Sequence, residues 1–172
     1  MKIFFCFFIF LSYQTAVLTA DVNITFIDMN KIISNSKPGI SILKQLNEVN
    51  NRNLNTFKDE ENILKQREEK ILAQKKIISN EEFKATVDLL KIDIKRYNEN
   101  RNITIANFNK LKTDNTNKLL KSINLILIKY SNKKSISIIL QKKDLVIGKS
   151  ELDITNEIIK IVNTDINPFM IK

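Results

Sequence analysis

The 172-residue sequence lacks the residue types that many enzymes need at their reactive centres. It contains no histidine, so His-based triads, imidazole acid–base catalysis and His-ligated metal sites are excluded. It has only two glycines and two prolines, and none of them lies in residues 40–147. A glycine-rich phosphate loop and a Rossmann domain are therefore also excluded, because their backbone turns need clustered glycines. The long stretch without either breaker is predicted to be mostly helical.

The amino terminus predicts a secretory signal peptide in residues 1–20. Lys2 supplies a positive start, residues 3–11 form an uninterrupted apolar run, and Ala20 offers a small side chain for cleavage. The run is shorter than the roughly 20 apolar residues that span a bilayer, and an N-terminal membrane anchor is the alternative interpretation. The single cysteine, Cys6, lies in this segment. We therefore expect an exported mature chain without disulfides, which needs another source of stability such as oligomerisation.

Residues 21–39 are predicted to contribute the first part of a small body. Residues 22–27 alternate between apolar and polar side chains and end with two apolar ones, which indicates a strand. Asp28 follows this strand as the expected cap of a short helix that carries Ile32 and Ile33.

Residues 133–163 are predicted to complete the body. Residues 135–140 and 144–148 indicate two further strands, and residues 155–162 indicate a short helix. The last segment, 164–172, is expected to be a loose tail.

A body with three short strands leaves open sheet edges, so we expect it to associate with copies of itself. The alternating apolar residues of the strands predict a shared oligomerisation core. Its expected members are Ile24, Phe26, Ile138, Leu140 and Val146.

Residues 40–132 are predicted to form an antiparallel helical hairpin, which makes the fold class α+β and mostly α. Apolar residues recur every seven positions in its first helix, residues 40–78, and this period indicates a coiled-coil seam. They are Leu43, Phe57, Leu64, Ile71 and Ile78. The chain is expected to reverse near residues 78–82, where Ser79 and Glu82 have the S-x-x-E spacing of a capping box. At 1.5 Å per residue the first helix would be roughly 58 Å long, so the hairpin must project as an arm.

The sequence is strongly basic, with a net charge of +9. Residues 102–143 hold nine lysines against one acidic residue. Such a surface attracts acidic proteins, anionic lipid or lipopolysaccharide, and these partners stay open. Nucleic acid is not expected, because the signal peptide indicates export and lysines without clustered arginines and exposed aromatics read bases poorly.

Two segments carry a family resemblance. The first covers residues 26–33, Phe-Ile-Asp-Met-Asn-Lys-Ile-Ile, and continues with Ser-Lys-Pro-Gly at 36–39. The second has apolar residues at 138–140 and 145–146, followed by Leu-Asp-Ile-Thr-Asn-Glu-Ile-Ile at 152–159. In this order, around a long charged hairpin, they resemble the Skp/OmpH family of periplasmic chaperones.

The resemblance implies a homotrimer in which a β-barrel body carries three helical arms around a cavity. It also implies ATP-independent holding of unfolded outer-membrane proteins in the periplasm, with no catalytic residue, metal or cofactor. The alternative is an exported coiled-coil protein that serves as a structural or adaptor component of the cell envelope. For the chaperone we expect many weak client contacts through basic and apolar side chains of the arm. The candidates are Lys75, Lys76, Lys84, Tyr97 and Phe108.

Overall fold

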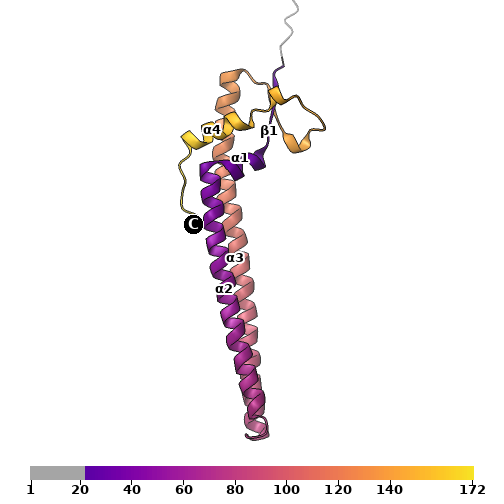
Figure 1. Cartoon of the computed structure of the whole chain (residues 1–172), viewed down its shortest axis with the longest axis vertical. Helices are drawn as coiled ribbons and strands as arrows, with labels where there is room; N and C mark the ends of the chain where they lie inside the picture. The colour runs from indigo at the N-terminus through magenta and orange to yellow at the C-terminus, as the bar shows by residue number, and fades with distance from the viewer. Residues whose placement is uncertain (1–21) are drawn as a thin grey trace, which may run out of the picture.

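The computed structural model describes residues 22–172, and it consists of a small body from which a long two-helix arm projects (Figure 1). The predicted signal peptide and Cys6 lie outside the described residues. The fold is mostly helical with a two-stranded parallel sheet. This agrees with the predicted fold class, α+β and mostly α.

Two long helices, α2 (Lys37–Gln74) and α3 (Asn80–Lys134), run side by side along the arm (Figure 1). Helix α2 begins before the predicted residue 40, because the hydroxyl of Ser36 caps it by accepting the N–H of Gly39 at 3.3 Å. Pro38 suits this first turn, where its missing N–H is not needed.

The turn at the arm tip follows the predicted capping box. The Glu82 N–H donates to Ser79 Oγ at 3.2 Å, and the Ser79 N–H donates to Glu82 Oε2 at 3.1 Å. The reciprocal bonds satisfy two backbone donors at the start of α3. Helix α2 ends earlier than predicted, at Gln74, because residues 75–78 form the turn.

Contacts across the arm define its register. The Tyr97 hydroxyl donates to Glu61 Oε1 at 2.5 Å, and the guanidinium of Arg101 lies 5.6 Å from the ring centroid of Phe57. In each pair the two residues are equally far in sequence from Ser79 in the turn. This spacing confirms the predicted antiparallel hairpin. The most buried seam residues toward the tip are Ile71, Leu90 and Tyr97.

The seam near the body differs from the predicted heptad. Leu43 is 42% exposed, whereas Ile42 and Leu46 are 3% and 5% exposed. A straight helix with 3.6 residues per turn drifts by about 20° per heptad. Over the length of α2 this drift carries the inward-facing stripe off the seven-residue positions.

The sheet of the body pairs β1 (Ile24–Ile27) with β2 (Ile138–Gln141) in parallel. Ile24 lies opposite Ile138, and Phe26 opposite Leu140. The predicted strand at 144–148 is wrong. Among the described residues this segment has no strand partner, and Phe26 forms its isolated bridge with Asp153 instead.

The core lies where helix α1 (Met29–Asn35) and helix α4 (Thr155–Asp165) meet the body end of the arm. As predicted, Asp28 caps α1, accepting the N–H of Lys31 at 2.9 Å. Burying each large aliphatic side chain contributes about 1.5–3 kcal/mol, so this junction supplies most of the packing energy. Its fully buried members are Ile32, Leu119, Ile123, Ile158 and Val162.

The C-terminal tail, residues 166–172, is not loose as predicted. It runs from α4 back along α2 (Figure 1), and its apolar side chains at Ile166, Phe169 and Ile171 pack against the core. The sequence pattern missed this contact because an extended segment of seven residues has no helical or strand period of its own to detect.

Candidate functional site

The tip of the arm presents exposed lysines beside an exposed apolar side chain. Lys75, Lys76 and Lys84 are all exposed, and the Lys75 ammonium lies 5.9 Å from the ring centroid of Phe83. Ile77, in the turn between them, is 80% exposed. The tip therefore offers positive charge and apolar surface together.

Two of the predicted client contacts are partly or wholly covered within the subunit. Tyr97 is 8% exposed in the seam, where burial and the hydrogen bond to Glu61 raise the pKa of its phenol. Phe108 is half-buried and packs against the core cluster. Both aromatic rings make contacts inside the subunit, and their contact with a client stays a prediction.

Aliphatic side chains supply the exposed apolar surface of the arm instead. They lie on both helices and in the turn between them, and they are between 42% and 80% exposed: Leu54, Ile63, Leu72, Ile77, Leu89, Ile92, Ile103 and Ile105. The sequence signal that could have found them is their position off the seven-residue stripe, because apolar residues outside a two-helix seam have no partner in the hairpin.

A hollow of about 230 Å³ lies on the side of the arm. Ile63 and Leu64 line it together with Arg67, Asp93 and Arg96. Asp93 pairs with Arg67 and, at 2.5 Å, with Arg96. One carboxylate thus faces two guanidinium groups, and Glu60 in the same lining balances the remaining positive charge beside the apolar side chains.

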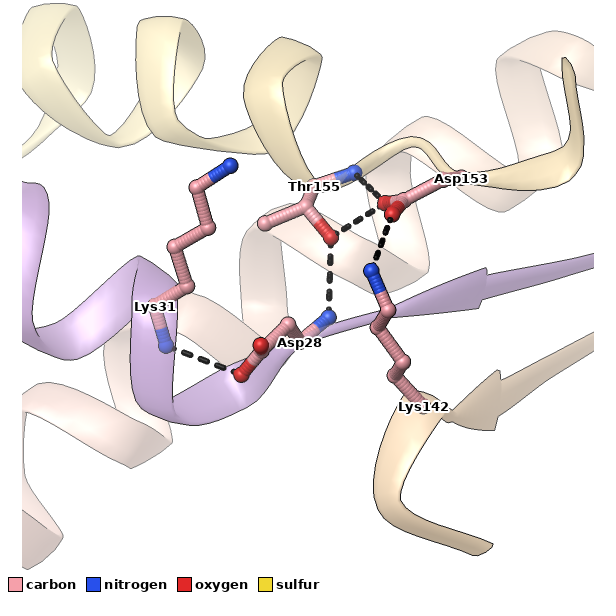
Figure 2. Close-up of polar contacts among 5 residues, drawn as sticks. All are labelled: Asp28, Lys31, Lys142, Asp153 and Thr155. Carbon is pink, nitrogen blue, oxygen red and sulfur yellow. Dashed lines mark hydrogen bonds and ion pairs between the residues drawn. The ribbon is translucent and has the colours of Figure 1, made fainter. Parts of the chain in front are cut away.

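A network of polar contacts joins the body elements that support the arm (Figure 2). The Asp28 N–H donates to Thr155 Oγ1 at 2.8 Å, and the Thr155 hydroxyl donates to Asp153 Oδ1 at 2.5 Å. The ammonium of Lys142 lies 3.1 Å from Asp153 Oδ2. The end of β1, the end of β2 and the start of α4 are therefore connected through three side chains, those of Lys142, Asp153 and Thr155.

The charge of Asp153 is stabilised within this network. Burial opposes its ionisation, but the hydroxyl and N–H of Thr155 and the ammonium of Lys142 outweigh burial and hold the pKa of Asp153 below its usual value. An ionised carboxylate accepts all three bonds, so the network is complete at neutral pH. This arrangement explains structurally why Asp and Thr flank Ile154 at this point of the chain.

The predicted oligomerisation residues lie at the sheet and in the loop after it. Phe26 is 6% exposed and buried within the subunit. The other four expose apolar area, with exposed fractions of 39% for Ile24, 45% for Ile138, 38% for Leu140 and 104% for Val146. A shared core between copies stays a prediction for these residues.

Among the described residues there is neither a cluster of metal-ligating side chains nor a helix suited to cross a membrane. Residues 22–172 contain no group of three or more His, Cys, Asp or Glu side chains that could hold a metal ion. None of the helices in this range is long and apolar enough to cross a membrane.

The fold and its exposed surfaces define a class of proteins in which a small α/β body carries one long helical arm. The family model described as "Outer membrane protein (OmpH-like)" matches residues 23–162, so the chain belongs to the OmpH-like family of periplasmic chaperones of outer-membrane proteins. This family is not enzymatic.

A solved structure supports the fold. It is a protein from Caulobacter crescentus CB15 that has been proposed to be an OmpH-like outer membrane chaperone. The match has a TM-score of 0.81 and 10% identity, and it covers 88% of this chain and 89% of that chain. No curated protein gives a significant match.

Proposed function

We propose that this protein is an ATP-independent periplasmic holdase that binds unfolded outer-membrane proteins between the arms of a homotrimer. The observation that carries the proposal is the set of exposed aliphatic side chains along a long basic arm, in a chain of the OmpH-like family. An unfolded β-barrel protein exposes apolar segments that aggregate in water. The exposed aliphatic side chains of the arm can bind these segments and keep them apart.

The dimensions of the arm favour this function. At 1.5 Å per residue, the 38 residues of α2 span about 57 Å. The body needs only the core around α1 and α4 for its own stability, so most of the arm is available for a partner. Contacts spread over this length can bind a flexible chain without a single deep pocket.

The charge of the arm favours rapid capture. An exposed ion pair contributes only about 0–1 kcal/mol, so affinity must come from many contacts. A positive surface nevertheless speeds encounter with acidic chains, and salt weakens this effect because the screening length is about 8 Å at physiological ionic strength. Anionic lipid or lipopolysaccharide could meet the same lysines in the envelope.

The test is the aggregation of a denatured β-barrel membrane protein, followed by light scattering without ATP. We expect a molar excess of the purified protein to slow aggregation strongly at low salt and less at high salt. An unchanged aggregation rate at low salt would contradict the holdase and favour the envelope adaptor.

Two sets of variants separate charge from apolar contact. The tip variant replaces Lys75, Lys76 and Lys84 by Gln, and we expect it to slow capture without abolishing it. Its matched control changes three exposed lysines of the body by the same substitution, at Lys31, Lys37 and Lys160. A second variant replaces Ile63, Ile92 and Ile103 by Ser, and we expect it to shorten the lifetime of the complex. Equal effects of the tip and body lysine variants would contradict a role for the tip.

A further inference from the structure

The C-terminal tail is held at the body end of the arm by a small set of side chains from both arm helices. We call this set the root site and define it as Gln45 of α2 with Asn115 and Lys118 of α3. The tail reaches it in an extended conformation beyond the end of α4 at Asp165.

The root site recognises the backbone of the tail. The side-chain amide of Gln45 donates through Nε2 to the carbonyl oxygen of Phe169 at 3.0 Å, and its Oε1 accepts the N–H of Ile171 at 3.2 Å. In a parallel sheet the N–H and C=O of one residue likewise form hydrogen bonds with the two residues on either side of its partner. Asn115 adds a longer bond, from Nδ2 to the carbonyl oxygen of Lys172 at 3.4 Å. These bonds would form with any extended peptide, because they use no side chain of the tail.

The side chains of the tail alternate as in a strand. Phe169 and Ile171 pack against the core cluster, whereas Met170 between them is 73% exposed. The Lys118 ammonium lies 4.3 Å from the ring centroid of Phe169, within the range of a cation–π contact. The root site therefore selects an extended segment with aromatic or aliphatic residues at every second position, which is the pattern of a half-buried β-strand.

We propose that the root site is a binding site for extended peptides of this pattern, and that the chain's own tail occupies it as an intramolecular competitor. The inference builds on the proposed chaperone function, since segments of unfolded β-barrel proteins belong to this peptide class. A tethered segment acts at an effective concentration in the millimolar range, so an incoming peptide must displace it or find it transiently released.

The experiment uses the full chain with a released tail. In the released variant, Phe169→Ser and Ile171→Ser remove the two inward side chains while leaving the arm and the core helices unchanged. The matched control is Met170→Ser, which changes the outward side chain of the same segment. Circular dichroism and thermal melting establish that both variants keep the fold before binding is measured.

Three hexapeptides serve as probes, and NMR titration of the Gln45 side-chain amide measures their binding. The first has the sequence of the tail, Asn-Pro-Phe-Met-Ile-Lys, and the second keeps only its alternation, Ser-Thr-Leu-Gln-Phe-Lys. The third, Asn-Pro-Ser-Met-Ser-Lys, lacks both apolar side chains. We expect the released variant to bind the first two at least tenfold more tightly than the wild type or the Met170→Ser control, because the competitor is gone.

Added to the released variant, Gln45→Ala should weaken binding of both peptides by removing the backbone contacts. The proposal is overturned if the released variant binds neither of the first two peptides, or only the tail sequence, or the third peptide equally well. These outcomes are separate from the aggregation test, which can fail or succeed whatever the root site binds.

Discussion

Thr155 shows how a single hydroxyl organises the body of this protein. Its Oγ1 accepts from the Asp28 N–H at the end of β1 and donates to Asp153, while the residue itself is 2% exposed at the start of α4. A buried N–H that loses its acceptor keeps its full desolvation penalty. We infer that this side chain fixes the relative position of sheet and helix more than it adds to packing.

Thr155→Val tests this role, because valine has nearly the same shape but cannot accept or donate. We expect the free energy of unfolding to fall by about 1–3 kcal/mol, measured by urea denaturation followed by circular dichroism. Thr164→Val on the same helix is the control, since its hydroxyl is exposed and bonds only to the Lys160 carbonyl within α4. Equal losses for the two variants would show that the network does not matter.

Tyr130 provides a spectroscopic test of the packing between α3 and α4. Burial, and next the hydrogen bond that its hydroxyl donates to Glu157, raise its pKa to about 12. In the folded protein its phenolate absorbance should therefore be missing near pH 10 and develop only toward pH 12. The unfolded chain loses the phenol proton at a lower pH than the folded protein does. The free energy of unfolding should therefore fall as pH rises from about 10 to 12.

Glu157→Gln removes the charge that disfavours the phenolate and should lower the pKa of Tyr130. Absorbance titration of the two proteins measures the difference. An unshifted Tyr130 in the variant would mean that the Glu157 contact is absent in solution.

At the scale of elements, the corner between α1 and α2 depends on Gly39. A Cβ at this position would lie 1.6 Å from the backbone oxygen of Ile33, so the two helices could not keep their approach. We expect Gly39→Ala to lower the free energy of unfolding by about 1–3 kcal/mol or more, as overpacked sites do. Thermal and urea denaturation measure this change.

Gly148→Ala is the matched control for this corner. Its Cβ would meet the ring of Phe26 at 2.8 Å, but a side chain can move where a backbone oxygen cannot. A loss at Gly148 as large as that at Gly39 would contradict the explanation.

At the scale of the whole molecule, exposed apolar residues of the sheet face predict assembly. Ile24 and Ile138 lie opposite each other on β1 and β2, and both remain more than one third exposed in the single chain. We expect sedimentation to report a trimer, and Ile138→Glu to dissociate it because a charge would be buried without a partner. Ile77→Glu at the arm tip is the control and should leave the trimer intact. A wild-type monomer at micromolar concentration would contradict the proposal.

The hairpin could be predicted from sequence because its signals are local. The seven-residue period, the Ser79–Glu82 capping box and the scarcity of glycine and proline each act within a few turns of helix. The same reasoning failed for residues 144–148, where an apolar run has strand character but no partner strand within the described chain. A strand forms only when another strand accepts its hydrogen bonds, and no local pattern contains that information.

The sequence by itself therefore determined the class of the protein: a helical arm on a small body, without histidine or a glycine-rich phosphate loop. Only the tertiary structure decided which side chains are available for binding. It buried Tyr97 and half-buried Phe108 in the subunit, left the aliphatic residues off the seam exposed, and brought the C-terminal tail to Gln45. Periodicity reports which residues share a face of a helix, whereas their availability for binding depends on what covers that face. The tail residue that contacts Gln45, Phe169, is 124 residues away from it in the chain.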